Sequence, residues 1–167
     1  MKKYIYMSLT MVLVSMFTLC MSACGDDDEK DMTKPVIASN ADTDNPINCQ
    51  VYHLGEVIPF RYTFTDNVEL GNFNIEIHSN HDHHTHSTEA VECEEEEHEH
   101  EDATPINPWV FNQSYAIPTG LQRYSAAVEI PIPSDIDPGD YHFMIRVTDK
   151  AGWQEIKSVA IEIEEQE

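Results

Sequence analysis

The sequence predicts an all-β protein, an immunoglobulin-like β-sandwich of about seven strands. From residue 35 onward, short segments alternate apolar and polar residues, as strands with one buried face do. Turn residues separate these segments, and no stretch shows a helical period. Tyr141 follows Gly139 by two residues, the arrangement of a tyrosine corner. The chain of 167 residues has room for one such domain, over residues 35–165.

The predicted strands follow one another closely along this domain. Residues 35–38 form an edge strand, because proline cannot donate a hydrogen bond to a ladder. The next strand is clearest, since Ile58, Phe60, Tyr62 and Phe64 alternate with polar or less apolar residues. The inward-facing positions of the remaining strands lie within residues 73–77, 109–111, 124–132, 141–147 and 159–163.

The N-terminal residues have the form of a secretory signal peptide. Lys2 and Lys3 precede an apolar run over residues 4–19, which is short for a membrane span. Small residues and a cysteine follow, so we expect a signal peptide over residues 1–23.

Residues 21–24, Met-Ser-Ala-Cys, resemble the lipobox of bacterial lipoproteins, whose cysteine is diacylated and becomes the new N-terminus. We therefore expect Cys24 to carry the lipid and anchor the protein in the outer membrane, because each buried methylene contributes about 0.8 kcal/mol. The acidic tether over residues 24–34 contains GDDDEKD, which resembles a signal for export to the cell surface. Cell-surface exposure is the expected location, and the periplasmic face is the alternative.

The formal net charge of -22 at pH 7 narrows the possible partners. Such a surface repels phosphate backbones, so nucleic acid is not an expected partner. The same negative field attracts cations and keeps the protein soluble.

The stretch HSNHDHHTHSTEAVECEEEEHEHED, residues 78–102, holds seven of the nine histidines. Most of it falls in a long acidic loop over residues 79–103, between the third and fourth predicted strands. In an immunoglobulin-like sandwich the third and sixth strands are antiparallel neighbours, so the end of one faces the start of the other. Alternation then places His78 and His142 together on the outer face of the sheet.

Two imidazoles placed together on neighbouring strands predict a metal site, because ligands that strands already hold in place lose less conformational entropy when they bind a metal. The expected ligands are His78, Asp82, His84, His86 and His142, with His81, His83 and His53 in reserve. Imidazole with carboxylate suits zinc, nickel, copper(II) or iron, and about four such ligands complete a zinc site, which we favour. Because these histidines must be deprotonated, affinity should fall below about pH 6. His98 and His100 are interpreted as part of a solvated, charged segment.

Cys49 and Cys93 remain after Cys20 and Cys24 are assigned to the signal. In an oxidising compartment we expect them to form a disulfide at the histidine-bearing end of the sandwich. Closing a loop of about 45 residues stabilises the fold by roughly 4 kcal/mol in the chain-entropy model. The alternative is that Cys93 serves as a thiolate ligand.

Other polar and aromatic residues have simpler interpretations. Asp66 and Asp149 end strands at the opposite pole, where cadherin-like domains sometimes bind calcium, but turn chemistry explains them without a metal. Trp109, Trp153 and Tyr115 could stack on a sugar, although tryptophans in a small domain are more often core or corner residues. No nucleophile and base pair stands out, so we expect a binding protein and not an enzyme.

The segments FTDNVELGNFNIEIHSNHDHHTH and GDYHFMIRVTDKAGW resemble a family of outer-membrane lipoproteins with an uncharacterised immunoglobulin-like domain. The turn VTDKAGW is also similar to turns of bacterial immunoglobulin-like and cadherin-like domains. The resemblance extends over roughly residues 34–163 and implies the fold and the location, without an activity.

The functional hypothesis is a lipoprotein that binds a divalent transition metal and buffers or delivers it, beside an outer-membrane transporter. An adhesion or glycan-binding accessory module is the alternative from another class. A metal-dependent hydrolase is the third hypothesis, and it needs an open coordination position inside a pocket.

Overall fold

The computed structural model describes residues 30–80 and 106–166, and every regular element in these ranges is a β-strand. The strands belong to one compact unit that begins at Asp31. In chain order they are β1 (Val36–Ala38), β2 (Gln50–His53), β3 (Val57–Thr65), β4 (Leu70–Ser79), β5 (Val110–Ala116), β6 (Arg123–Pro131), β7 (Gly139–Asp149) and β8 (Gln154–Glu164).

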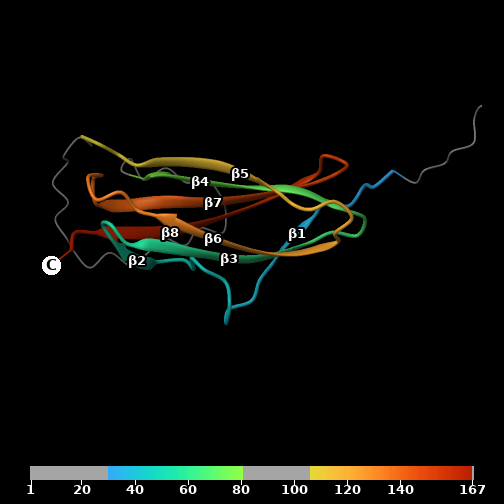
Figure 1. Ribbon diagram of the computed structural model, residues 1–167, viewed down its shortest axis with the longest axis horizontal. Coiled ribbons are helices and arrows are strands. Elements are labelled where there is room, and N and C mark those ends of the chain that lie inside the picture. The colour runs from blue at the N-terminus through green and yellow to red at the C-terminus, as the bar shows by residue number, and fades with distance from the viewer. Residues whose placement is uncertain (1–29, 81–105, 167) are drawn as a thin grey trace, which may run out of the picture. The chain divides into compact units, whose positions relative to one another are not determined.

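The strands form two sheets that pack face to face (Figure 1). One sheet has the order β1-β3-β6, and the other has the order β2-β8-β7-β4-β5. All neighbours pair antiparallel except β2 and β8, which run parallel. The all-β sandwich predicted from the sequence is therefore confirmed. Within the two described ranges, no helix long and apolar enough to cross a bilayer occurs.

The core between the sheets is built on stacked aromatic rings. Phe60 of β3 lies between Phe73 of β4 and Phe143 of β7, with ring centroids 5.8 and 5.9 Å away. All three side chains are buried, and the alternating isoleucines of β4 and β7 continue the same layer. Offset stacking adds about 0.5–1.5 kcal/mol per pair to the burial of apolar area. These contacts lock the inward face of each strand and so determine which residues face outward.

One strand, β2, was not placed by the sequence patterns. β2 has only four residues and pairs with the end of β8, within a segment that the sequence predicts as loop. Its alternation is too short to distinguish from a polar connection. The strand predicted near Trp109 is β5, and it extends the five-stranded sheet along the outer edge of β4.

The predicted tyrosine corner is present at the start of β7. The Tyr141 hydroxyl donates to the carbonyl oxygen of Asp137 at 2.6 Å and accepts from the Trp109 amide at 3.3 Å. Tyr141 therefore joins the turn before β7 to the residue that leads into β5. Both backbone groups would lose this partner if the hydroxyl were removed.

Replacement of Tyr141 by phenylalanine should lower the free energy of unfolding by about 1–3 kcal/mol, because it leaves buried polar groups unsatisfied. Urea unfolding followed by tryptophan fluorescence measures the change. The matched control is Tyr124→Phe, since the Tyr124 hydroxyl makes no hydrogen bond within the described residues. Equal losses in both variants would contradict the role given to the corner.

Alkaline pH should destabilise the fold through its buried tyrosines. Burial is the main reason that the pKa of Tyr52 is raised to about 12 and that the pKa values of Tyr62, Tyr115 and Tyr141 are raised. Their contribution to stability is complete below the ordinary tyrosine pKa of about 10 and is lost as the pH rises through the folded-state pKa values. Absorbance at 295 nm should show tyrosinate forming at higher pH in native protein than in urea-unfolded protein, and coincident titrations would contradict this expectation.

Candidate metal centre

His78 and His142 face each other across the β4–β7 ladder, as the sequence predicts. The antiparallel register pairs them directly, and their ring centroids lie 5.6 Å apart with planes inclined at 75°. The neighbouring pairs Ile77–Phe143 and Ser79–Tyr141 fix this register, because Ile77, Phe143 and Tyr141 all face the core. Two imidazoles therefore share the outer face at one end of the five-stranded sheet.

The two histidines are covered, although they lie on the outer face of the sheet. His142 is only 3% exposed, although it lies on the face opposite Tyr141 and Phe143. The His78 side chain is also largely covered. β7 is the central strand of the five-stranded sheet, so His142 is flanked by His78 on one side and by Ala160 on the other. The pair is a sheltered site and not an open display.

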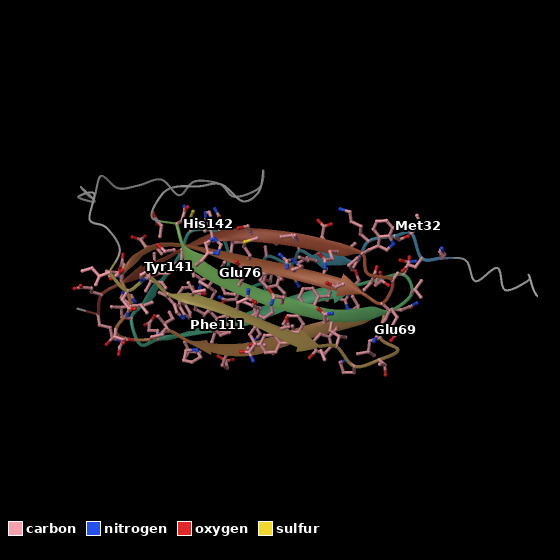
Figure 2. All side chains as sticks on the ribbon, turned by 90° about the horizontal axis from the view of Figure 1, so that it is seen from above. Met32, Glu69, Glu76, Phe111, Tyr141 and His142 are labelled. Atoms are coloured by element: carbon pink, nitrogen blue, oxygen red, sulfur yellow. The ribbon has the colours of Figure 1, made fainter. Side chains whose placement is uncertain are left out.

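Glu76 is a carboxylate neighbour of the pair that the sequence analysis did not single out. It precedes His78 by two residues on the same face of β4, and its Oε1 lies 3.4 Å from Nδ1 of His78. The Asn112 amide on β5 donates to the other carboxylate oxygen at 3.4 Å. Figure 2 shows Glu76 and His142 on neighbouring strands. A carboxylate beside one ring nitrogen orients an imidazole so that its other nitrogen can bind a metal.

The reserve ligand His53 is not brought to the pair. It ends β2, which is separated from β4 by β8 and β7, and it pairs in register with Glu164. Its Nδ1 lies 3.4 Å from Glu56 and its Nε2 lies 3.5 Å from Glu164. His53 is thus held by carboxylates at the same end of the sheet, apart from the other two histidines.

The remaining predicted ligands belong to the part of the sequence outside the described residues. These are His81, Asp82, His83, His84 and His86, together with the alternative ligand Cys93. Cys24, the predicted lipidation site, also lies outside the described ranges. Cys49 is disulfide-bonded, and its pairing with Cys93 stays a prediction because the other three cysteines are not among the described residues.

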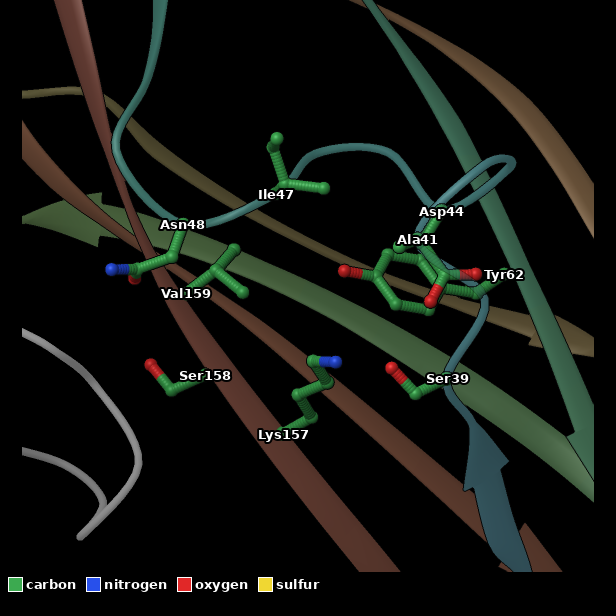
Figure 3. A pocket seen from close by; sticks show the side chains of 9 residues that line it. All are labelled: Ser39, Ala41, Asp44, Ile47, Asn48, Tyr62, Lys157, Ser158 and Val159. Carbon is green, nitrogen blue, oxygen red and sulfur yellow. The ribbon is translucent and has the colours of Figure 1, made fainter.

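A pocket of about 280 Å³ lies beside the segment that connects β1 and β2 (Figure 3). Lys157 of β8 reaches over the ring of Tyr62, with 5.5 Å between Nζ and the ring centroid. The Tyr62 hydroxyl donates to the carbonyl oxygen of Pro46 at 2.6 Å. Burial is the main cause that raises the Tyr62 pKa, and the charge of Asp44 adds to it. The phenol therefore serves as a donor that holds the connecting segment on the sandwich.

The aromatic residues considered for sugar binding do not form a common surface. Trp109 is 7% exposed and packs against Tyr141, while Tyr115 stacks on Phe73 with centroids 4.9 Å apart. Trp153 is 39% exposed but lies in the turn between β7 and β8, at the end away from Trp109. The core interpretation of Trp109 is confirmed.

Comparison with known proteins identifies one family. Residues 22–164 match the family described as a domain of unknown function, DUF4625. No curated protein matches the chain.

Proposed function

The chain belongs to the DUF4625 family of domains of unknown function, and from that premise we propose that it binds a divalent transition metal at the His78–His142 pair. Zinc is the first choice, with nickel, copper(II) or iron as the other ions that suit these donors. The role is to buffer the metal or to deliver it.

The observation that carries the proposal is the cross-strand imidazole pair. Two imidazoles on one tetrahedral zinc ion have ring centroids roughly 5 Å apart, given zinc–nitrogen bonds of about 2.0–2.1 Å. The 5.6 Å separation of the two rings is close to this value. Small rotations of the His78 and His142 side chains would bring one nitrogen of each ring within bonding distance of a single zinc ion. Because the strands already hold both residues, binding loses less conformational entropy than it would on a free loop.

Glu76, which lies next to His78 on the same face of β4, supports the same proposal. A carboxylate next to a ligating histidine makes the imidazole a stronger donor and holds its ring in place. Glu76 is in turn held by Asn112 on the adjacent strand. Metal-binding histidines commonly have a carboxylate of this kind beside the ring nitrogen that does not bind the metal, and Glu76 lies 3.4 Å from Nδ1 of His78.

Two protein ligands do not complete a zinc site, so further donors are needed. The sequence directly after Asn80 is HDHHTH, which offers four imidazoles and one carboxylate. We propose that two donors from among Asp82, His84 and His86 complete the set, with His81 and His83 as substitutes. The short connection from β4 makes these residues the nearest candidates along the chain.

The location proposed for this activity is the outer membrane, through a lipid on Cys24. The lipobox-like residues 21–24 and the acidic tether support a surface lipoprotein, and the periplasmic face is the alternative. A metal-binding module held there is suited to supplying an outer-membrane transporter. The negative charge of the chain would raise the local concentration of cations.

Zinc titration by calorimetry tests the proposal on protein made without a histidine tag. We expect a dissociation constant below about 10 μM at neutral pH, equivalent to a binding free energy of at least about 6.8 kcal/mol. Joint replacement of His78 and His142 by glutamine should weaken binding at least tenfold, since it removes the two ligands that the sheet holds.

The matched control is the joint replacement of His98 and His100 by glutamine, which removes two histidines from the acidic segment of the sequence. This control should retain wild-type affinity. Thermal unfolding in chelator verifies that both double variants are folded. Affinity that survives loss of His78 and His142 but not of His98 and His100 would refute the site.

Replacement of Glu76 by glutamine should weaken zinc binding by about 10–100-fold, because the support of His78 is lost while its imidazole stays. The same calorimetric titration measures this change. Glu155→Gln is the control, since Glu155 pairs with Lys34 far from the histidines. An unchanged affinity in Glu76→Gln would remove Glu76 from the site.

A further inference from the structure

Three aspartates meet at the end of the sandwich opposite the histidine pair. Asp31 precedes β1, Asp66 follows β3, and Asp149 ends β7. Each carboxylate contributes one oxygen to a group whose members all lie within 4.8 Å of one another. Asp66 and Asp149 were candidates from the sequence, and Asp31 is the member that only the fold brings to them. Three segments of the chain thus bring like charges together in one place.

Turn chemistry accounts for only one oxygen of two of these residues. Asp66 Oδ1 accepts hydrogen bonds from the amides of Val68 at 2.9 Å and Glu69 at 2.7 Å. Asp149 Oδ1 accepts from the amides of Gly152 at 2.6 Å and Trp153 at 2.8 Å. The predicted turn roles of both aspartates are confirmed. Their second oxygens need a separate explanation.

Those second oxygens are buried without a hydrogen-bond donor. Oδ2 of Asp66 and Oδ2 of Asp149 have no partner among the described residues, and Asp149 is only 4% exposed. A buried carboxylate oxygen without a donor is costly, because it has lost its water. No ion pair formed within the described ranges includes Asp31, Asp66 or Asp149. A cation between the carboxylates would supply a partner for both oxygens.

The backbone brings the β7 end unusually close to β4 at this point. A Cβ atom at Gly71 would lie 2.8 Å from the carbonyl oxygen of Asp149 and 2.9 Å from that of Thr148. The ladder between β4 and β7 shifts register at the same place, between Leu70 and Asn72. Glycine therefore permits an approach that no other residue allows. Beside it, the Lys150 amide donates to the carbonyl oxygen of Glu69 at 3.0 Å, which holds the turn after Asp66 next to the turn after Asp149.

We propose that Asp31, Asp66 and Asp149 form a calcium site. Calcium takes six to eight oxygen ligands at about 2.3–2.6 Å, so two ligands across the ion are separated by roughly 4.6–5.2 Å. The oxygens of the three aspartates lie within 4.8 Å of one another, so they are close enough to bind one ion. Carboxylates are hard ligands that suit calcium, whereas zinc prefers the imidazoles at the other end. Backbone carbonyls and water supply the remaining positions.

The site would join Asp31, in the short segment before β1, to two turns of the sandwich. Asp31 is held there already, since its carbonyl oxygen accepts from Nε1 of Trp153 at 2.9 Å and its Oδ1 accepts from the Asn67 amide at 3.1 Å. Calcium would cross-link this segment to the β3–β4 and β7–β8 turns. The calcium site lies roughly 25 Å from the histidine pair, at about 3.3 Å per residue along β4. The two sites can therefore be tested separately.

Thermal unfolding with and without calcium tests the proposal. In 5 mM calcium, the melting temperature of the protein should rise by at least about 3 °C over its value in EGTA, because calcium binds the native state. Asp149→Asn and Asp66→Asn keep the turn acceptors and should abolish the rise. In EGTA these variants should melt at or above the wild-type temperature, since one of three crowded charges is gone. Asp42→Asn, an exposed control, should retain the full calcium effect.

Terbium luminescence supplies a readout independent of stability. Terbium occupies calcium sites and is sensitised by a nearby indole, and Trp153 contacts Asp31 directly. Excitation of tryptophan should give terbium emission that calcium displaces and that Asp149→Asn loses. Trp153→Phe should lose the emission while keeping the calcium-dependent rise in melting temperature.

Three results would overturn the site. The first is no change in melting temperature with calcium. The second is an equal rise in Asp66→Asn, which would assign the effect to the acidic stretch around residues 92–102. The third is an Asp149→Asn variant that is destabilised equally in calcium and in EGTA, which would make the carboxylate purely structural. A magnesium effect equal to that of calcium at the same concentration would overturn the choice of ion.

Discussion

The antiparallel register between β4 and β7 is the constraint on which the rest of this structure depends. Ile75, Ile77, Phe143 and Ile145 face the core, so a slip of one residue would turn the whole apolar set toward the surface. The same register sets His78 against His142 at one end of the ladder and Leu70 against Asp149 at the other. The buried side chains of β4 and β7 therefore determine the positions of two polar clusters, the histidine pair and the aspartates around Asp149.

The two ends of this ladder offer different ligand chemistry. Imidazoles with a supporting carboxylate lie at one end, and three carboxylates lie at the other. Imidazole suits transition metals and carboxylate oxygen suits calcium, so under the two proposals the ends would select different ions from the same solution. The high net negative charge attracts cations to both without choosing between them. Selectivity thus comes from donor type and spacing, and the overall charge acts only on concentration.

The sandwich and the histidine pair could be predicted because their signals are local or follow from the fold class. The two-residue period identified seven of the strands. The pairing of the third and sixth predicted strands, which are β4 and β7, followed from the expected topology. β2 gave no such signal, because four residues do not establish a period. The burial of His142 was also missed, since alternation tells which face a side chain occupies and not what covers that face.

By itself the sequence determined the all-β class, the turn roles of Asp66 and Asp149, and the presence of many imidazoles beside a strand end. Tertiary structure alone decided which charged residues meet. Glu76 lies beside His78 and accepts a hydrogen bond from Asn112 of β5, a strand that is distant from β4 in the sequence. Asp31 joins two turns from which it is separated by 35 and 118 residues of chain. These contacts depend on the strand register, on a glycine that permits close backbone approach, and on the position of Asp31 before β1. None of these features can be recognised from a short stretch of sequence.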